Sequence, residues 1–283
     1  MKKFLRVILG IMTMIGVSMF LYFMGHRIQW EKYEFAVKLC ISEQTAVIMA
    51  ETAGLKTAGA GEFDAEDMVM QIVYQLARRS IVKVVVKDAA GSGIVWKIED
   101  GIVIVSNRHL LMKDVTAEIG FANGESVAAD IIGYSQQYDI GFVRIPEETV
   151  TGNILRDIYE AVPVLYETES EEARAAFGSQ YATARVMQVG AVSDRNTANF
   201  STGNVIGLKY MPLFNTIVLE TACYSKAGMS GGGVFDEGGH FLGMISGGEV
   251  PEDADTREAE ITYSIPPALI ASEYEAIISR TTQ

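Results

Sequence analysis

The sequence is poor in the residues that build disulfide frameworks and metal sites: two cysteines and three histidines occur in 283 residues. Two cysteines cannot form a disulfide framework, and on their own they are too few for a structural zinc site. No metal or organic cofactor is implied, because no cluster of histidine, cysteine and carboxylate residues has ligand spacing. The sequence leaves open whether Cys40 and Cys223 pair, and it favours two free, mostly buried thiols.

Basic residues are also scarce, since 23 Lys and Arg face 36 Asp and Glu, a net charge of −13. Four of the basic residues and none of the acidic ones lie in residues 1–27, namely Lys2, Lys3, Arg6 and Arg27. Subtracting these four leaves 19 basic and 36 acidic residues in the remainder, a net of −17. Such a surface repels nucleic acid phosphates and anionic lipid headgroups, so we expect no nucleic-acid partner.

The basic N-terminus precedes an uncharged apolar run at residues 7–24. Eighteen helical residues span about 27 Å, close to the thickness of a hydrocarbon core. A cleaved signal peptide is the alternative, but its apolar region is usually shorter, and no small-x-small cleavage site precedes Gly25. We therefore expect an uncleaved signal anchor. The basic residues before the run outweigh His26 and Arg27, which predicts a cytoplasmic N-terminus and an extracytoplasmic remainder, at the cell surface or in the periplasm.

The rest of the chain divides into a helical stalk and linker at 28–63 and one main domain at 64–283. The domain begins with a helical pattern, "DAEDMVMQIVYQLARRS", for which Asp64 is a plausible N-cap. After Ser80, short β-branched or alternating runs are broken by Gly, Asn and Asp, which predicts an antiparallel, all-β barrel or sandwich. Within these runs "FANGES" predicts a hairpin, because Asn-Gly suits a two-residue turn.

These strand patterns form two halves of similar size, at about 80–146 and about 181–266. Between them, residues 147–180 are acidic and poorly periodic, and we interpret them as a crossing between the two halves. The pattern after the second half predicts a C-terminal helix at about 267–280. No internal sequence repeat stands out.

A glycine-rich stretch in the second half, "YSKAGMSGGGVFDEGGHFLG" at residues 224–243, contains Ser230. By itself it is more typical of a flexible hairpin. A serine hydroxyl becomes a nucleophile when a base, usually histidine, takes its proton. His26 lies at the predicted membrane boundary, and His240 belongs to the same hairpin as the serine. His109 remains, after the apolar strand pattern "GIVIVSNR".

The base needs an acid that holds its tautomer and stabilises the imidazolium ion. Asp139 directly precedes an apolar strand pattern, where aspartate is also a common turn residue. His109 and Asp139 lie in the first half and Ser230 lies in the second, so the three predict a site between the halves.

One alternative can be rejected, the nucleophile elbow of α/β hydrolases, although residues 228–232 ("GMSGG") match its G-x-S-x-G pattern. That fold needs a strand–turn–helix context, and its acid and histidine follow the serine. Only 53 residues follow Ser230, and they show no β-α-β alternation. His240 would supply the histidine from within the same turn, so the match is accidental.

Four segments, in order, resemble the trypsin-like serine proteases, and specifically their HtrA (Deg) branch. The resemblance covers about residues 70–278. The segments are "GSGIVWKIEDGIVIVSNRHLL", "EIGFANGESVAADIIGYSQQYDIGFVRIP", "ETACYSKAGMSGGGVFDEGGHFLGMISG" and "ITYSIPPALI".

This resemblance implies two six-stranded β-barrels and a catalytic triad of His109, Asp139 and Ser230 that hydrolyses peptide bonds. It implies an oxyanion hole formed by the main-chain N–H groups of Gly228 and Ser230. It also implies an S1 pocket with Tyr224 at its base and a β-strand wall opposite, formed by Ile245, Ser246 and Gly247. Because Tyr224 is not an acid, we expect small or medium apolar side chains at P1.

The sequence departs from the family at Met229, where Asn or Asp is usual, and at Arg108, where a small or amide residue is commoner. We expect no PDZ domain after the predicted protease domain. The favoured function is a membrane-anchored extracytoplasmic serine endopeptidase, acting in quality control or envelope protein processing. The alternative is a peptide-binding or sensor protein with little or no turnover, and a purely structural β-rich module is the least favoured interpretation. HtrA-type enzymes are often trimers, so a homo-oligomer is compatible with the resemblance, but no feature establishes it.

Overall fold

The structure, a computed structural model, describes residues 65–191, 199–249 and 259–281. The predicted signal anchor, the stalk at 28–63, Cys40 and the proposed N-cap Asp64 lie outside these ranges. Within the described ranges, no helix has the length and apolar character needed to cross a membrane.

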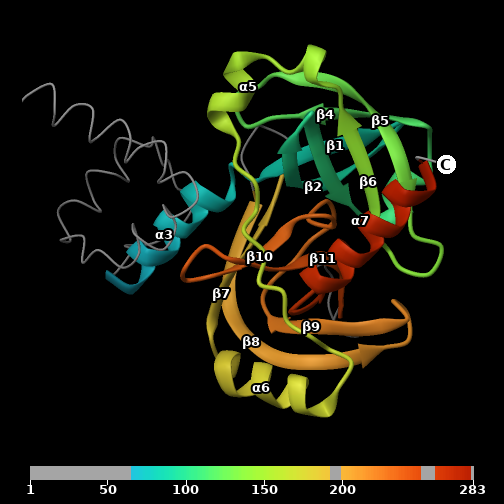
Figure 1. Cartoon of the computed structure of the whole chain (residues 1–283). Coiled ribbons are helices and arrows are strands. Elements are labelled where there is room, and N and C mark those ends of the chain that lie inside the picture. The colour runs from blue at the N-terminus through green and yellow to red at the C-terminus, as the bar shows by residue number, and fades with distance from the viewer. Residues whose placement is uncertain (1–64, 192–198, 250–258, 282–283) are drawn as a thin grey trace, which may run out of the picture. The chain divides into compact units, whose positions relative to one another are not determined.

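Six antiparallel strands close into a first barrel in the order β1-β2-β3-β6-β5-β4 (Figure 1). Its strands are β1 (Ile81–Val86), β2 (Ala89–Glu99), β3 (Gly101–Ser106), β4 (Thr116–Gly120), β5 (Ser126–Tyr134) and β6 (Gly141–Ile145).

A second closed barrel has the order β10-β11-β12-β9-β8-β7. Its strands are β7 (Arg185–Gly190), β8 (Asn199–Met211), β9 (Thr216–Ala222), β10 (Gly233–Asp236), β11 (Phe241–Glu249) and β12 (Ile261–Ile265). The predicted all-β, double six-stranded fold is therefore confirmed.

Strand β3 illustrates why the apolar runs fold in this way, since all six of its residues are buried. Successive side chains of a strand point to opposite faces. Ile102 and Ile104 accordingly join the apolar interior of the first barrel. Val103 and Val105 join a different cluster, which includes Phe241 of the second barrel. The run without alternation thus reflects a strand buried on both faces, and one of these faces helps to join the barrels.

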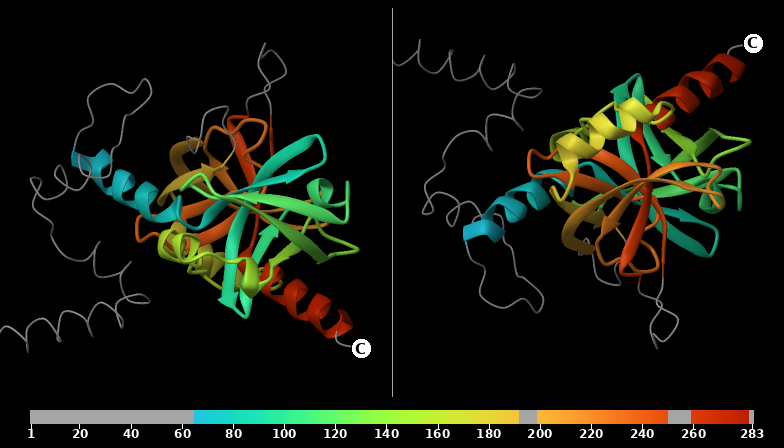
Figure 2. Two further views of the ribbon diagram at one scale, coloured as in Figure 1. Left: turned by 90° about the horizontal axis from the view of Figure 1, so that it is seen from above. Right: turned by 90° about the horizontal axis from the view of Figure 1, so that it is seen from below.

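Two helices flank the barrels, α3 (Ala65–Ala77) and α7 (Pro267–Thr281), and Figures 1 and 2 show them on opposite sides. Helix α7 contacts β5 of the first barrel and β11 of the second. The Tyr274 ring of α7 lies edge-on to Phe142, with ring centroids 5.2 Å apart. A side chain at Gly133 of β5 would begin 2.8 Å from Cγ2 of Ile277. Helix α7 therefore packs closely against both barrels.

The segment predicted as a crossing connects the two barrels, and it contains short helices that the sequence pattern did not predict. It contains a 3-10 turn at Glu147–Thr149 and the helices α5 (Gly152–Asp157) and α6 (Glu171–Tyr181). Each helix begins with a side-chain cap: Thr151 accepts from the Ile154 N–H and Ser170 accepts from the Ala173 N–H. Helix α6 buries only Phe177 and Tyr181, so it lacks the apolar stripe from which helices are usually recognised. The capping residues Thr151 and Ser170 were the sequence features from which the starts of these two helices could have been predicted.

The predicted hairpin at "FANGES" is present and joins β4 to β5, but its turn is one residue longer than expected. The Phe121 N–H donates to the Glu125 carbonyl, which leaves residues 122–124 as a three-residue loop. Gly124 has φ +88° and donates its N–H to the Phe121 carbonyl. The glycine of the Asn-Gly pair thus takes the left-handed position of a three-residue hairpin loop.

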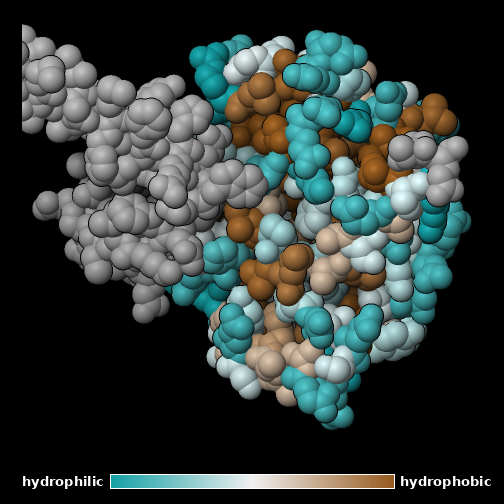
Figure 3. Space-filling view, viewed as in Figure 1, coloured by the Kyte–Doolittle hydropathy of each residue, from teal (hydrophilic) through white to brown (hydrophobic). Residues whose placement is uncertain are grey.

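Hydrophilic side chains cover much of the face in Figure 3 and divide its apolar residues into separate patches. The large exposed apolar residues are scattered along the described chain: Met112, Val115, Leu155, Leu165, Phe200, Ile206, Tyr210, Leu213 and Tyr224.

Cys223 is expected to resist alkylation in the folded protein. Its side chain is 1% exposed, and burial raises the pKa of the thiol to about 12. The thiolate is the reactive form, and very little of it exists at pH 8. Mass spectrometry of the full chain treated with iodoacetamide at pH 8 should find Cys223 unmodified without denaturant and fully modified in urea. Stoichiometric modification of Cys223 in the folded chain would contradict this prediction.

Candidate active site

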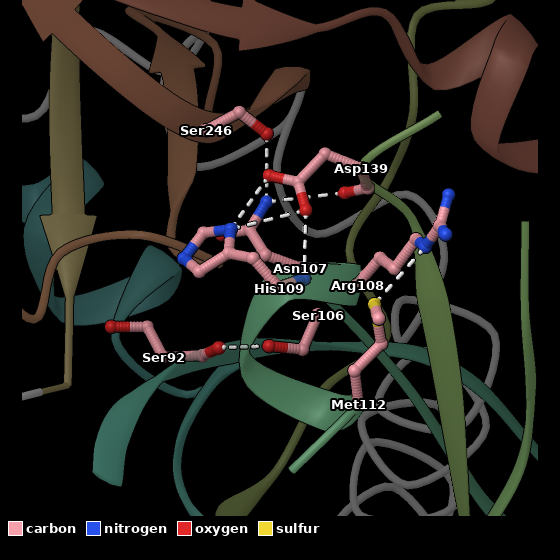
Figure 4. Close-up of polar contacts among 8 residues, drawn as sticks. All are labelled: Ser92, Ser106, Asn107, Arg108, His109, Met112, Asp139 and Ser246. Atoms are coloured by element: carbon pink, nitrogen blue, oxygen red, sulfur yellow. Dashed lines mark hydrogen bonds and ion pairs between the residues drawn. The ribbon is translucent and has the colours of Figure 1, made fainter. Parts of the chain in front are cut away.

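His109 and Asp139 lie side by side at the end of the first barrel. His109 is the second residue of a short helix, α4 (Arg108–Leu111), which follows β3 after Asn107. The His109 Nδ1 atom is 3.0 Å from Oδ1 and 2.9 Å from Oδ2 of Asp139, and the main-chain N–H of His109 donates to Oδ1 at 2.9 Å (Figure 4). An ionised carboxylate only accepts hydrogen bonds, so Nδ1 carries the hydrogen and Nε2 is left as the acceptor.

The loop that carries Asp139 is held at both ends. The main-chain N–H of Ser135 donates to the Ile140 carbonyl at 2.8 Å, which closes the loop. The Ser135 hydroxyl oxygen accepts from the N–H groups of Gln137 and Tyr138, each at 3.1 Å. The position of the carboxylate therefore depends on local hydrogen bonds within the loop as well as on the barrel.

Arg108, which the sequence marked as a departure from the family, is directed toward this loop. Its Nη1 donates to the Gln136 carbonyl at 2.8 Å, and its guanidinium lies 5.8 Å from the centroid of the Tyr134 ring. Its Nε contacts the sulfur of Met112 at 3.2 Å, as Figure 4 shows. The side chain thus binds the loop that carries Asp139.

Ser230 lies in the loop between β9 and β10 of the second barrel. Its main-chain carbonyl accepts from the N–H of Ser92 in β2, which fixes this residue against the first barrel at 2.8 Å. Among the described residues, the Ser230 hydroxyl has no hydrogen bond to His109 or to any other group, and neither the Gly228 nor the Ser230 N–H has an acceptor. Gly228 has φ +92°, a conformation that glycine adopts readily. The triad and the oxyanion hole therefore stay predictions at Ser230.

Met229 packs into the interior of the second barrel and is 1% exposed. Its neighbours in this apolar cluster include Val234 and Leu242. A side chain at Gly190 would begin 2.9 Å from the Met229 Cα atom and 3.0 Å from its Cγ atom. The Ser230 loop is therefore anchored by apolar burial at the position where the family usually has a polar residue.

Asn107, two residues before His109, forms a side-chain hydrogen bond between the two barrels next to the His109–Asp139 pair. It is fully buried, and its Nδ2 donates to the Ser246 Oγ of β11 at 2.7 Å and to the Asp139 carbonyl at 3.3 Å (Figure 4). A carbonyl can only accept, so this contact fixes which side-chain atom of Asn107 is the nitrogen. Asn107 occupies the N-cap of α4 but makes no side-chain cap bond: its Nδ2 binds these two groups, and its buried Oδ1 has no hydrogen-bond partner among the described residues.

Removing either partner of the Asn107–Ser246 hydrogen bond is expected to destabilise the protein. Asn107→Ala and Ser246→Ala should each lower the free energy of unfolding by about 1–3 kcal/mol, since each leaves a buried polar group without its partner. Because both changes remove the same bond, the double variant should lose less than the sum of the two single losses. Urea denaturation of the four proteins measures this coupling. Strict additivity would contradict it.

The four residues predicted for the S1 pocket differ in exposure. Ile245 and Ser246 are buried, Gly247 is partly buried, and Tyr224 is 40% exposed. A side chain at Gly247 would begin 2.9 Å from Cζ of Phe214, which reaches this strand from the turn between β8 and β9. Phe214 carries no local sequence signal that places it beside the predicted substrate strand. Its position depends on how the hairpin folds over β11.

His240 forms a second aspartate–histidine pair, within the hairpin that joins β10 to β11. Its Nδ1 is 3.1 Å from both carboxylate oxygens of Asp236. Asp236 Oδ1 also accepts from the N–H groups of Gly238 and His240, each at 2.9 Å. This aspartate therefore organises the turn, as expected for a histidine that belongs to the hairpin. The third histidine, His26, lies outside the described residues.

No group of three or more histidine, cysteine, aspartate or glutamate residues that could hold a metal ion occurs within residues 65–191, 199–249 and 259–281.

A family model described as a trypsin-like peptidase domain matches residues 91–244. This match covers more than half of the chain, and the chain therefore belongs to the trypsin-like peptidase family. Two curated relatives are named "Serine protease Do-like HtrA", from Lactococcus lactis subsp. lactis (strain IL1403) and subsp. cremoris (strain MG1363). Each is 24% identical over 182 residues, which is 62% of this chain. The chain spans about two fifths of their length, 41% and 42%.

Two solved structures share the fold. The HtrA-type protease AlgW with a tripeptide has a TM-score of 0.59 at 13% identity, over 74% of this chain and 63% of that chain. An inactive serine-to-alanine mutant of Rv3671c from M. tuberculosis H37Rv has a TM-score of 0.56 at 15% identity, over 79% of this chain and 98% of that chain. The resemblance to trypsin-like proteases of the HtrA branch is thereby confirmed.

Proposed function

We propose that this protein is a serine endopeptidase that uses His109, Asp139 and Ser230. The observation that carries the proposal is the contact of His109 Nδ1 with both oxygens of Asp139, at 3.0 and 2.9 Å. This contact leaves Nε2 as a free proton acceptor in a family whose members hydrolyse peptide bonds. The side chain of His109 is 55% exposed, so a substrate has access to it.

In the proposed reaction, Ser230 Oγ attacks the carbonyl carbon of the scissile peptide bond while His109 Nε2 takes the hydroxyl proton. The tetrahedral intermediate carries its negative charge on the former carbonyl oxygen, which the N–H groups of Gly228 and Ser230 stabilise. His109 then gives the proton to the leaving amine, and an acyl-enzyme remains on Ser230. A water molecule, deprotonated by His109, hydrolyses the acyl-enzyme and regenerates the serine. Asp139 stabilises the imidazolium ion in both halves.

The substrates proposed are peptides and unfolded proteins. AlgW has been solved with a bound tripeptide and with a decapeptide, which supports peptide binding by a protein of this fold. The test is cleavage of a peptide library by the full chain in detergent, beside Ser230→Ala. We expect cleavage by the wild type alone, after small or medium apolar P1 residues. A profile dominated by Arg or Lys at P1 would contradict the specificity, and peptide binding without cleavage would favour the sensor alternative.

The rate should depend on pH through His109. A protonated imidazole has no lone pair for the serine proton, so kcat/KM is expected to be lower in acid than at neutral pH. Initial rates at low substrate concentration from about pH 5 to 8 measure this dependence. A flat profile would argue against His109 as the general base.

We further propose that residues 7–24 anchor the protein in a membrane, with the protease domain on the extracytoplasmic side. The uncharged apolar run and the basic residues before it support this topology. After expression in cells, the full chain should stay with the membrane in alkaline carbonate, and externally added protease should digest the domain. Release of the chain by carbonate would contradict the membrane anchor. A protease domain that is digested only after the membrane is permeabilised would contradict the extracytoplasmic orientation.

A further inference from the structure

Ser92, in the "GSG" stretch of β2, binds the Ser230 loop with both its main chain and its side chain. The residue is 0% exposed. Its N–H donates to the Ser230 carbonyl at 2.8 Å, and its Oγ donates to the Gly228 carbonyl at 2.7 Å. The same Oγ accepts from the Ala191 N–H at 2.9 Å, and the Ser92 carbonyl accepts from Ser106 Oγ at 2.7 Å (Figure 4). One residue of the first barrel thus contacts three residues that belong to the second barrel and its loop.

The two carbonyls that Ser92 binds belong to the peptide units on either side of the unit that carries the Ser230 N–H, a predicted oxyanion donor. A peptide unit is planar, so a hydrogen bond to its carbonyl also fixes the direction of its N–H. Ser92 Oγ fixes the unit between Gly228 and Met229, and Ser92 N–H fixes the unit that follows Ser230. The unit between them carries the Ser230 N–H, and its Met229 carbonyl accepts from Gly232 N–H at 2.9 Å. Three successive peptide units are therefore held in place.

The sequence provides space for this close contact through glycine. Gly231 has φ +83°, and a Cβ atom there would lie 2.0 Å from the Ser92 carbonyl oxygen. In β2, next to Ser92, a Cβ atom at Gly91 would lie 3.3 Å from the Ser230 carbonyl oxygen. A larger residue at Gly231 would separate β2 from the Ser230 loop, whereas one at Gly91 would clash first with Leu110, at 2.7 Å. The glycines around the two serines thus allow the backbones to approach.

We propose that Ser92 is a positioning residue for catalysis, whose hydroxyl holds the Ser230 loop so that the Ser230 N–H faces the developing oxyanion. The proposal rests on the proposed function. An oxyanion hole acts through donors that are oriented before the reaction begins. A hydroxyl that fixes the loop from the other barrel supplies this orientation without touching the substrate. A residue that merely joined the barrels would affect stability and leave kcat unchanged.

The test compares Ser92→Ala with Ser106→Ala in the full chain. Ser106 is a matched control, because it is equally buried and its hydroxyl binds the Ser92 carbonyl while making no bond to the Ser230 loop. Two quantities are measured below the melting temperature of each variant: kcat and KM for a peptide substrate, and amide hydrogen exchange at Met229, Gly231 and Gly232. These three N–H groups are hydrogen-bonded in the folded loop.

For Ser92→Ala we expect kcat to fall about tenfold to a hundredfold, less than the loss of a whole donor, with KM changed less than twofold. Exchange at the three amides should become faster, whereas Ser106→Ala should change neither kcat nor this exchange. Unchanged exchange in Ser92→Ala, or faster exchange with an unchanged kcat, would overturn the proposal. If Ser92→Ala does not fold, Ser92→Cys replaces it: a thiol is a weaker donor of similar size, and kcat should fall in the same direction.

The two measurements separate this proposal from the proposed function. A wild-type chain that does not cleave the peptide contradicts the endopeptidase, and the exchange comparison then still decides whether Ser92 holds the loop. If the wild type cleaves the peptide and Ser92→Ala equals it in kcat and in amide exchange, the proposed endopeptidase function stands and the role of Ser92 is overturned.

Discussion

Replacing Asp139 by asparagine is expected to lower kcat about 10⁴-fold while the fold is retained. The asparagine oxygen can still accept from the His109 main-chain N–H, as Asp139 Oδ1 does at 2.9 Å. Its NH₂ group, however, would donate to His109 Nδ1, and the hydrogen of the imidazole would then reside on Nε2. In that tautomer Nε2 cannot take the proton of Ser230. The substitution thus removes the base without removing the histidine.

The second aspartate–histidine pair supplies a matched control for this experiment. Asp236→Asn makes the same chemical change beside His240, and the asparagine oxygen can still accept the two turn bonds of the hairpin. Its kcat should equal that of the wild type. Kinetics with a peptide substrate and circular dichroism of both variants provide the measurement. An Asp139→Asn variant that is folded and within tenfold of wild-type kcat would show that Asp139 does not set the tautomer of the catalytic base.

Replacing Met229 by asparagine, one of the residues usual in the family, is expected to destabilise this protein. Met229 is 1% exposed within an apolar cluster, so the change removes apolar burial and places an amide among groups that cannot pair with it. The expected loss in the free energy of unfolding is about 3–5 kcal/mol. Because the Ser230 loop depends on this anchor, the fraction of molecules that react in an active-site titration should also fall.

Met229→Leu is the control, since a swap between apolar residues of similar volume usually costs less than about 1.5 kcal/mol. Urea denaturation measures the free energy of unfolding of both variants. If Met229→Asn were as stable as wild type and more active, the loop would depend on a polar contact, and the apolar anchor would be the wrong account.

The pattern of strands could be predicted from the sequence because its physical signals are local. β-branched residues in short runs, separated by Gly, Asn and Asp, mark strands wherever they lie, and β3 and β6 fall where these runs occur. The helices α5 and α6 could not be recognised in the same way, since only Ile154 is buried in the first and only Phe177 and Tyr181 in the second. Their start signals were single capping residues within an acidic segment.

Within the site, the sequence predicted the histidine, its acid and the serine, but it did not identify Asn107, which binds the Asp139 carbonyl, or Ser92, which binds the Ser230 loop. Asn107 and Ser92 act through contacts with residues more than 90 positions away, such as Asn107 with Ser246 and Ser92 with Gly228. Such contacts arise only when two barrels meet, and no local pattern encodes them. The available signal was the position of Ser92 between two glycines, which indicated a close approach of backbones but not the partner.

The most direct test of a catalytic Ser230 is its reaction with a fluorophosphonate, which modifies serines that are activated by a neighbouring base. The full chain in detergent is treated beside Ser230→Ala, and the modified peptide is identified by mass spectrometry. We predict that one equivalent of the probe attaches to Ser230 in the wild type and that none attaches in Ser230→Ala. Labelling that survives the substitution, or that is absent from both proteins, would contradict the catalytic serine.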